Sequence, residues 1–443
     1  FRLDYLTPFM TTMPTQSGHG ETQQQQQHQI MSTRGMASLL MFVGVMTIGI
    51  NVLMILPLHS IPVHENHYFF SNEGHMYTGG GDSRTKTTSV TDPNHSQYVD
   101  KNPTEDSGNA IRFPNLSDEE GEEYILGIFK EAGVDLTPEM KAQLPSWSQV
   151  RDVVGPHPYI LGLDQCQTYR DKAPPLERML GSSGMFNTGT NLITHLLKQN
   201  CEIPERRALH GPHQAKESYG MRWQVPWGKH TPAKFRLEHA TQKASAINKD
   251  WILPVVTIRH PYSWFKSMCK NSYSAKWSHP KMDSTKCPNI RASTKDDIRR
   301  NQENGHTNVQ IGDWNPVDVK YAEGREDHHD NIAATWNDWY GYFLNQHDFP
   351  YVVVRMEDMV FYPKETTRAV CECAGGEIRK DKDTFTFIVD SAKADSPGHD
   401  KSTGIFAAWI KYSKRPEPRY GFSQQDYDDA KGILNSTLME ALG

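Results

Sequence analysis

The stretch Gly181 to Asn200, GSSGMFNTGTNLITHLLKQN, places a glycine-rich turn directly before an amphipathic helix. Such a turn lets backbone N–H groups converge on an anion, and the helix behind it adds the positive end of its dipole. Gly184 to Asn191 has the G-x-x-x-x-G spacing of a phosphate-binding loop, but Thr190 occupies the usual lysine position and Asn191 the usual magnesium-binding position. The stretch therefore predicts a phosphate site without metal chemistry. The alternative is an ordinary strand-to-helix turn.

A second anion site is predicted about seventy residues downstream. The apolar run Leu253 to Ile258 predicts a strand that ends at Arg259, and Pro261 suits the first position of a following helix. Ser267 then lies about two helical turns in, eight residues after Arg259. A strand-end arginine and a helical hydroxyl in this arrangement can close on one anion.

Together, FNTGTNLI and the R-x-P-x5-S arrangement resemble two signature elements of sulfotransferases that use 3′-phosphoadenosine 5′-phosphosulfate (PAPS). These are the 5′-phosphosulfate loop and the 3′-phosphate site. The resemblance spans Leu176 to Gly443 and implies PAPS as co-substrate, with no metal. The residues that it assigns to PAPS are Asn187, Thr188, Gly189, Thr190, Asn191, Arg259 and Ser267.

Between these two elements, Gln224 to Arg236 (QVPWGKHTPAKFR) resembles the K-x-H-x-P element that carries the catalytic base in many sulfotransferases. His230 is the candidate base, because transfer to a hydroxyl needs a group that removes its proton, and histidine suits this near neutral pH. The alternative is a surface or core histidine, since the chain has 20 histidines.

The loop departs from the family at Asn187, where the family has a lysine that bridges the sulfonate and the leaving phosphate. An amide dipole stabilises the leaving group less than a cation does. Either another cation enters the site, with Lys229 the first candidate and Lys172 the second, or the protein binds the donor without transferring sulfate.

Further stretches follow the family's order. Asn331 to Tyr342 (NIAATWNDWYGY) resembles the W-N-x-x-Y helix of Golgi sulfotransferases, and Arg355 to Asp358, after the apolar strand Tyr351 to Val354, is similar to an R-Y-E-D turn. Lys401 to Gly404 corresponds to a late basic loop that closes over the nucleotide, which makes Lys401 a further candidate ligand.

Strands alternating with helices predict an α/β fold with a mainly parallel central sheet flanked by helices and ligands at the carboxyl ends of the strands. The resemblance implies a P-loop NTPase-like sulfotransferase fold. It also implies that this sheet belongs to a sulfotransferase-like domain over residues 166–443.

The amino-terminal third predicts a membrane anchor. Residues 1–35 contain a glutamine run and predict a disordered cytoplasmic tail. Met36 to Leu58 is 23 residues without a charge, long enough to span a bilayer as a transmembrane helix; a cleaved signal peptide is the alternative. Residues 59–116 predict a flexible lumenal stem, and residues 117–165 a helical preface that starts with a capping box, Ser117 to Glu120.

The remaining expectations concern loops, helix ends and cysteines. Lys276 to Arg325 predicts a long loop, in which Trp277, Trp314 and Tyr321 pack or stack on sugars. His328 to Asp330 predicts a solvated helix start rather than a metal site, and Asp426 to Leu442 a helix. Six cysteines in an oxidising lumen indicate disulfides, with Cys269 and Cys287 the preferred pair.

These observations favour a single-pass type II Golgi membrane protein with a lumenal catalytic domain. It would transfer a sulfuryl group from PAPS to a hydroxyl acceptor, a glycan in preference to a small molecule. The net charge of −6 argues against a nucleic-acid partner. One alternative is a catalytically silent PAPS- or glycan-binding homologue, and a second is a P-loop kinase, against which Thr190 and Asn191 argue.

Overall fold

The computed structural model describes residues 116–279, 287–345, 348–380, 384–390, 404–414 and 422–441. The predicted tail, the predicted span Met36 to Leu58, residues 59–115 of the predicted stem, and Lys401 lie outside these ranges. Within the described part of the chain, none of the helices is both long and apolar enough to cross a membrane.

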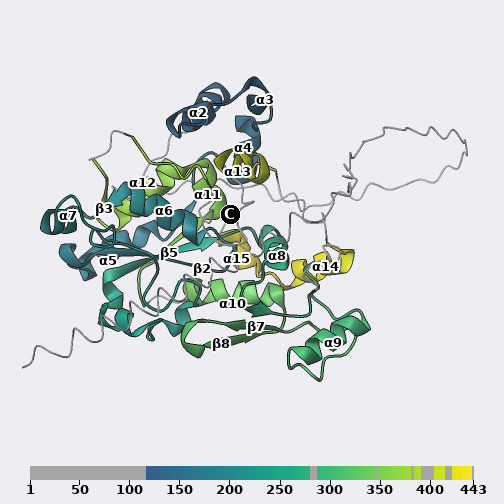
Figure 1. Cartoon of the computed structure of the whole chain (residues 1–443). Coiled ribbons are helices and arrows are strands. Elements are labelled where there is room, and N and C mark those ends of the chain that lie inside the picture. The colour runs from purple at the N-terminus through teal and green to yellow at the C-terminus, as the bar shows by residue number, and fades with distance from the viewer. Residues whose placement is uncertain are drawn as a thin grey trace, which may run out of the picture. The chain divides into compact units, whose positions relative to one another are not determined.

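A five-stranded sheet forms the centre of the fold, in the order β1-β9-β5-β2-β4. Figure 1 shows β2 and β5 in the middle of the molecule. Strand β2 (Met179–Gly184) pairs in parallel with β5 (Ile252–Ile258) over six residues and with the short β4 (Met221–Arg222). Strand β5 pairs in parallel with β9 (Val352–Arg355), while the edge strand β1 (Ile160–Leu161) is antiparallel to β9. The predicted α/β fold with a mainly parallel sheet is confirmed.

Helices cover both faces of the sheet, because alternate residues of its buried strands point to opposite sides. On one face Leu253 and Val255 share an apolar cluster with side chains of α6 (Thr190–Asn200) and α12 (Pro363–Cys373). On the other face Ile252 and Val256 share a cluster with side chains of α8 (Pro261–Lys270) and α10 (Ile332–Leu344). Figure 1 shows α6 and α12 above the sheet and α10 below it. The carboxyl ends of β2, β5 and β9 meet between these layers, where the sequence places the candidate site.

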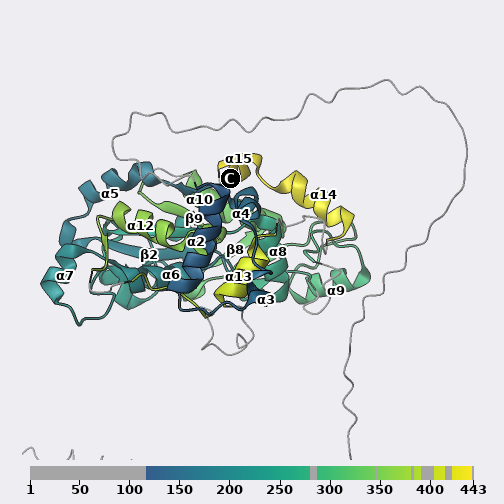
Figure 2. The same ribbon diagram turned by 90° about the horizontal axis from the view of Figure 1, so that it is seen from above.

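The predicted helical preface packs against the end of the main fold. Helix α2 (Asp118–Glu131) starts with the predicted capping box, in which Ser117 and Glu120 bond each other's backbone N–H. Helices α3 (Pro138–Lys141) and α4 (Trp147–Val154) follow. Phe129 and Trp147 share a buried apolar cluster with Phe361 of α11 (Met356–Phe361) and Trp409 of α13 (Ile405–Tyr412). Figure 2 shows α2, α4 and α13 side by side.

Three local predictions are wrong. The expected loop Lys276 to Arg325 contains α9 (Lys295–Glu303) and β7 (Val317–Lys320), which pairs with β6 (Ala275–Lys276) and β8 (Glu326–His329) in an antiparallel sheet. His328 and His329 therefore belong to a strand, not to a helix start, and His329 is buried against Asp338. The expected helix Asp426 to Leu442 is two helices, α14 (Gln424–Ile433) and α15 (Ser436–Ala441). In each case the tertiary contacts overrode a weak local pattern.

All six cysteines form disulfides, and the preferred pair Cys269–Cys287 is confirmed. The other two disulfides, Cys166–Cys373 and Cys201–Cys371, join the last turn of α12 to α5 (Cys166–Lys172) and to β3 (Cys201–Glu202). Strand β3 pairs with β10 (Glu377–Ile378), and α7 (Pro204–His210) follows β3. The cross-links fix the amino end of α5 and the carboxyl end of α6 against one face of the sheet.

Candidate functional site

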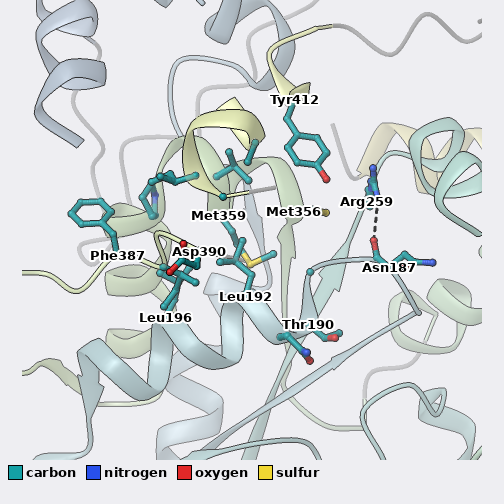
Figure 3. A pocket seen from close by; sticks show the side chains of 18 of the residues that line it. Asn187, Thr190, Leu192, Leu196, Arg259, Met356, Met359, Phe387, Asp390 and Tyr412 are labelled. Atoms are coloured by element: carbon teal, nitrogen blue, oxygen red, sulfur yellow. Dashed lines mark hydrogen bonds between the residues drawn. The ribbon is translucent and has the colours of Figure 1, made fainter. Parts of the chain in front are cut away.

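A cavity of about 290 Å³ lies at the carboxyl ends of β2, β5 and β9 (Figure 3). Six of the sequence-predicted residues line it: Asn187, Gly189, Thr190, Asn191, His230 and Arg259. Three more, Thr188, Lys229 and Ser267, lie behind the wall and contact residues of the loop or of the wall. The fold thus brings the two predicted anion elements and the candidate base to one cavity.

The glycines and one buried threonine set the backbone conformation of the loop after β2. Gly189 has φ of 87° and ends the loop as the N-cap of α6, and a β-carbon there would lie 2.8 Å from the Met359 side chain. The Thr188 hydroxyl donates to the Met185 carbonyl and is 2.8 Å from the Thr257 hydroxyl. Because α6 has no side-chain cap, its first N–H groups, beginning at Thr190, keep the donor capacity that suits an anion.

Arg259 is placed by the end of β5 and by α8, as the sequence predicts. Its guanidinium donates to the Ser267 hydroxyl at 2.6 Å and to the Asn187 carbonyl at 3.2 Å. The residue is buried, and its guanidinium lies 5.3 Å from the ring of Tyr412 (Figure 3). A buried guanidinium at a cavity wall provides a fixed positive charge for a second anion.

The charge of Arg259 also affects its neighbours. Burial lowers the pKa of His260 to about 4, and Arg259 beside it adds to this effect. Burial raises the pKa of Glu357 at the start of α11, and Arg259 opposes that rise. The charge of Arg259 therefore affects the pKa of a residue at the carboxyl end of each strand, His260 after β5 and Glu357 after β9.

His230 lines the cavity, and one of its ring nitrogens lies against a main-chain carbonyl. Its Nδ1 lies 2.7 Å from the Gly184 carbonyl oxygen, which can only accept, so in the neutral ring Nδ1 carries the proton and Nε2 the lone pair. The ring lies 4.6 Å from that of Phe186, and the Trp339 indole donates to the His230 carbonyl at 2.9 Å. This is the tautomer that a general base acting through Nε2 requires.

The two candidate cations differ in position. The Lys229 ammonium donates to Asn191 Oδ1 at 3.0 Å and lies 3.3 Å from the centre of the Trp223 ring. Lys229 is buried behind Asn191 and does not line the cavity. Lys172 is exposed on α5, whose Tyr169 bonds Met179 at the opposite end of β2. Lys229 is therefore near the loop and Lys172 is not.

Asn187 has its side chain directed away from the cavity centre. Its Nδ2 donates to the carbonyls of Asn271, at 2.9 Å, and Ser267, at 3.3 Å, which belong to the end of α8. Its φ of 63° is left-handed, a conformation that asparagine tolerates better than most residues. The backbone of Asn187, not its amide, contacts Arg259 (Figure 3).

Several wall residues carry no signal in the sequence. One side of the cavity wall consists of apolar side chains from α11, from α13 and from residues 387–388. Asp390 is the single carboxylate among the described lining residues. Gly404, in the predicted late loop, does line the cavity, whereas Trp277, Trp314 and Tyr321 do not. Tyr273, after α8, lines it too, although only its place near Ser267 could have drawn attention to it. Some lining residues belong to stretches described from the sequence but were given no role: Phe186, Leu192, Leu196 and Met356. The residues missed altogether are Tyr273, Met359, Val360, Pro363, Phe387, Ile388, Asp390, Ile405, Ala408 and Tyr412.

Within the described ranges, no group of three or more histidine, cysteine, aspartate and glutamate side chains could hold a metal ion. Comparison of the chain with family models, with curated proteins and with solved structures gave no match. The function is therefore inferred from the geometry of the cavity and its lining residues.

Proposed function

We propose that the protein transfers a sulfuryl group from PAPS to a hydroxyl of an acceptor, and that the acceptor is a glycan. The observation that carries this proposal is the pairing of Arg259 with Ser267, 2.6 Å apart, at the cavity that the glycine-rich loop also lines. A donor with anionic groups at both its 3′ and 5′ positions needs two separated anion sites. The loop with the start of α6 would hold the 5′-phosphosulfate, and Arg259, whose guanidinium is positioned by the Ser267 hydroxyl, the 3′-phosphate.

In the proposed reaction the acceptor oxygen attacks sulfur while the bond from sulfur to the 5′-phosphate oxygen breaks. The acceptor proton passes to Nε2 of His230, whose Nδ1 proton is held by Gly184. The leaving group is 3′-phosphoadenosine 5′-phosphate (PAP), which carries the displaced charge on its 5′-phosphate. His230 accordingly acts as the catalytic base, and Gly184 fixes its ring.

Lys229 would supply the cation that the loop lacks, acting through Asn191. The Lys229 ammonium donates to Asn191 Oδ1, so the Nδ2 N–H groups of Asn191 point away from the lysine. Asn191 lines the cavity beside the start of α6, so a polarised amide there would donate to the leaving phosphate. Lys229 is in this scheme a positioning residue, and Asn191 the group that touches the donor.

A catalytically silent PAPS- or glycan-binding homologue is the second candidate, favoured by Asn187. Its amide is committed to the end of α8, so the loop presents neither a cation nor this amide to the leaving phosphate. Asn187→Lys separates the two candidates. A gain of activity from an inactive wild type supports the silent protein, whereas an active wild type excludes it. A P-loop kinase fits the loop less well, because Thr190 and Asn191 replace its lysine and its magnesium ligand.

The proposed location is the Golgi membrane, with residues 36–58 as the anchor and the described part of the chain in the lumen. Such a location would give the enzyme access to glycans and would support the three disulfides. Protease protection in sealed microsomes tests this orientation. Digestion of the carboxyl-terminal part without detergent would contradict it.

The direct test of function combines binding with transfer in the full-length protein. PAP should bind much more tightly than ATP in a calorimetric titration, and EDTA should not change the affinity for PAP. Sulfate from labelled PAPS should appear on a hydroxyl acceptor. His230→Ala should lower turnover by about 10²–10⁴-fold with PAP affinity nearly intact, and exposed His213→Ala provides the control. Equal binding of ATP and PAP would overturn the donor assignment.

A further inference from the structure

We propose that Tyr273 is the acceptor platform of this site, and that its exposed ring stacks on the apolar face of an acceptor pyranose. This inference rests on the proposed function, which it deepens by naming where the glycan binds. Tyr273 lies between α8 and β6, six residues after Ser267, and the sequence assigned it no role.

An aromatic column connects Tyr273 to the candidate base. The Tyr273 ring stacks on Phe186, with ring centres 5.2 Å apart and planes 16° from parallel, and Phe186 contacts the His230 ring at 4.6 Å. All three residues line the cavity, but Phe186 is 9% exposed and Tyr273 is 40% exposed. The column therefore begins in the wall at the base and ends in an aromatic residue that solvent reaches.

The backbone at Tyr273 has a left-handed conformation. Its φ is 51°, in a region that bulky side chains rarely adopt and that is therefore strained for tyrosine. Neighbouring bonds hold the segment in place: Asn187 donates to the Asn271 carbonyl, and Ala275 N–H donates to the Ser272 carbonyl. Strain that surrounding bonds maintain at a cavity wall is a recurrent property of ligand sites.

The position of Tyr273 favours the acceptor over the nucleotide. The donor's 3′-phosphate belongs at Arg259, whose aromatic neighbour is Tyr412 of α13. Tyr273 instead belongs to the column of His230, which must lie beside the hydroxyl that attacks sulfur. A group that stacks on the ring face of Tyr273 that Phe186 leaves open is therefore held at the same cavity as His230.

A pyranose fits this surface because one face of the ring consists of C–H groups while its hydroxyls project from the edge. Such a face packs on an aromatic ring without desolvating the hydroxyls, which stay available to the base and to the cavity rim. A planar phenol, as in a tyrosine peptide, is the competing occupant. The experiment below distinguishes the two.

The test measures binding, so that it does not depend on turnover. The full-length protein, saturated with PAP, is titrated with cellotetraose, N-acetyllactosamine and a desulfated heparin tetrasaccharide. At least one should bind. Tyr273→Ala should weaken that binding about tenfold, and Tyr273→Phe should retain it. Tyr273→Gly should also weaken it, although glycine suits the backbone, which excludes strain release as the cause. Tyr412→Ala, the matched control, should weaken PAP binding and leave glycan binding unchanged.

The outcomes separate this proposal from the proposed function. Glycan binding that depends on Tyr273, without any sulfate transfer, supports the platform and overturns the enzyme. Sulfate transfer with a KM for glycan that Tyr273→Ala leaves unchanged overturns the platform and supports the enzyme. No binding of any of the three glycans, selective transfer to a tyrosine peptide, or a loss of PAP affinity in Tyr273→Ala equal to that in Tyr412→Ala would each overturn the platform.

Discussion

The side-chain amide of Asn187 donates to the main-chain carbonyl of Asn271 at 2.9 Å, so the loop after β2 is tied to the end of α8. The same side chain also donates to the Ser267 carbonyl, while the main-chain carbonyl of Asn187 accepts from Arg259. Asn187 therefore joins the two anion elements that the sequence separates by some seventy residues. The residue that departs most from the sulfotransferase pattern has a structural role of its own.

This connection predicts a loss of stability when Asn187 is changed. Asn187→Ala removes the donor from the carbonyls that end α8 and places a less tolerant residue at φ of 63°, so unfolding should become easier by about 1–3 kcal/mol. Asn187→Gly removes the same donor but accepts the backbone conformation, and should lose about 1 kcal/mol less. Urea denaturation measures both. Equal stability of the alanine variant and the wild type would show that the connection contributes nothing.

Arg259→Ala should weaken binding of the 3′-phosphorylated nucleotide selectively. A partly desolvated arginine–phosphate contact contributes on the order of 1.5–3 kcal/mol, which corresponds to a ten- to hundredfold loss of PAP affinity. Adenosine 5′-phosphate lacks the 3′ group, so its affinity should change little. Calorimetric titration of both ligands provides the comparison. An equal loss for the two nucleotides would mean that Arg259 supports the loop through the Asn187 carbonyl and does not hold a 3′-phosphate.

Lys229 and Asn191 should behave as one unit in turnover. If the lysine acts through the asparagine, Lys229→Ala and Asn191→Ala should each lower kcat, and the double variant should lose little more than the worse single variant. PAP affinity should fall less than kcat, because the charge matters most when the leaving phosphate gains negative charge. Single-turnover rates of the wild type, the two single variants and the double variant form a double-mutant cycle that tests this. Additive losses would show that the two residues act independently despite their 3.0 Å bond.

His260 should make the folded protein less stable in acid. Burial lowers its pKa from the ordinary 6.5 to about 4, with Arg259 contributing. Between these values the unfolded chain binds a proton that the folded chain does not, so stability present above pH 6.5 is lost as the pH falls toward 4. The slope from this residue reaches about 1.4 kcal/mol per pH unit.

His260→Phe should reduce that slope, because the new ring can keep the contact with Tyr262 and does not titrate. Urea denaturation at several pH values between about 7 and 4.5 measures the slope in both proteins. Exposed His213→Phe is the matched control and should leave the slope unchanged. An unchanged slope in His260→Phe would place the acid sensitivity elsewhere.

Strong local patterns were predictable. The uninterrupted apolar run before Arg259 can only be satisfied by burial, and it forms the central strand β5. The serine and threonine caps of α2 and α3, and Pro261 at the start of α8, lie where side-chain chemistry requires. Weak patterns failed: the polar stretch that carries β7 and β8 forms strands because each supplies the other's hydrogen bonds. Neither stretch alone indicates this pairing.

Which residues could meet at a site follows from the sequence, because the carboxyl ends of parallel strands converge and the local pattern marks Gly184 and Arg259 as strand-end residues. How these residues meet depends on the tertiary structure. It turned Asn187 toward α8, placed Lys229 behind Asn191, fixed the His230 tautomer through Gly184, and left Tyr273 exposed in a strained conformation. Each of these depends on a hydrogen bond or a packing contact between segments distant in sequence, whose geometry the whole fold sets and no local pattern records.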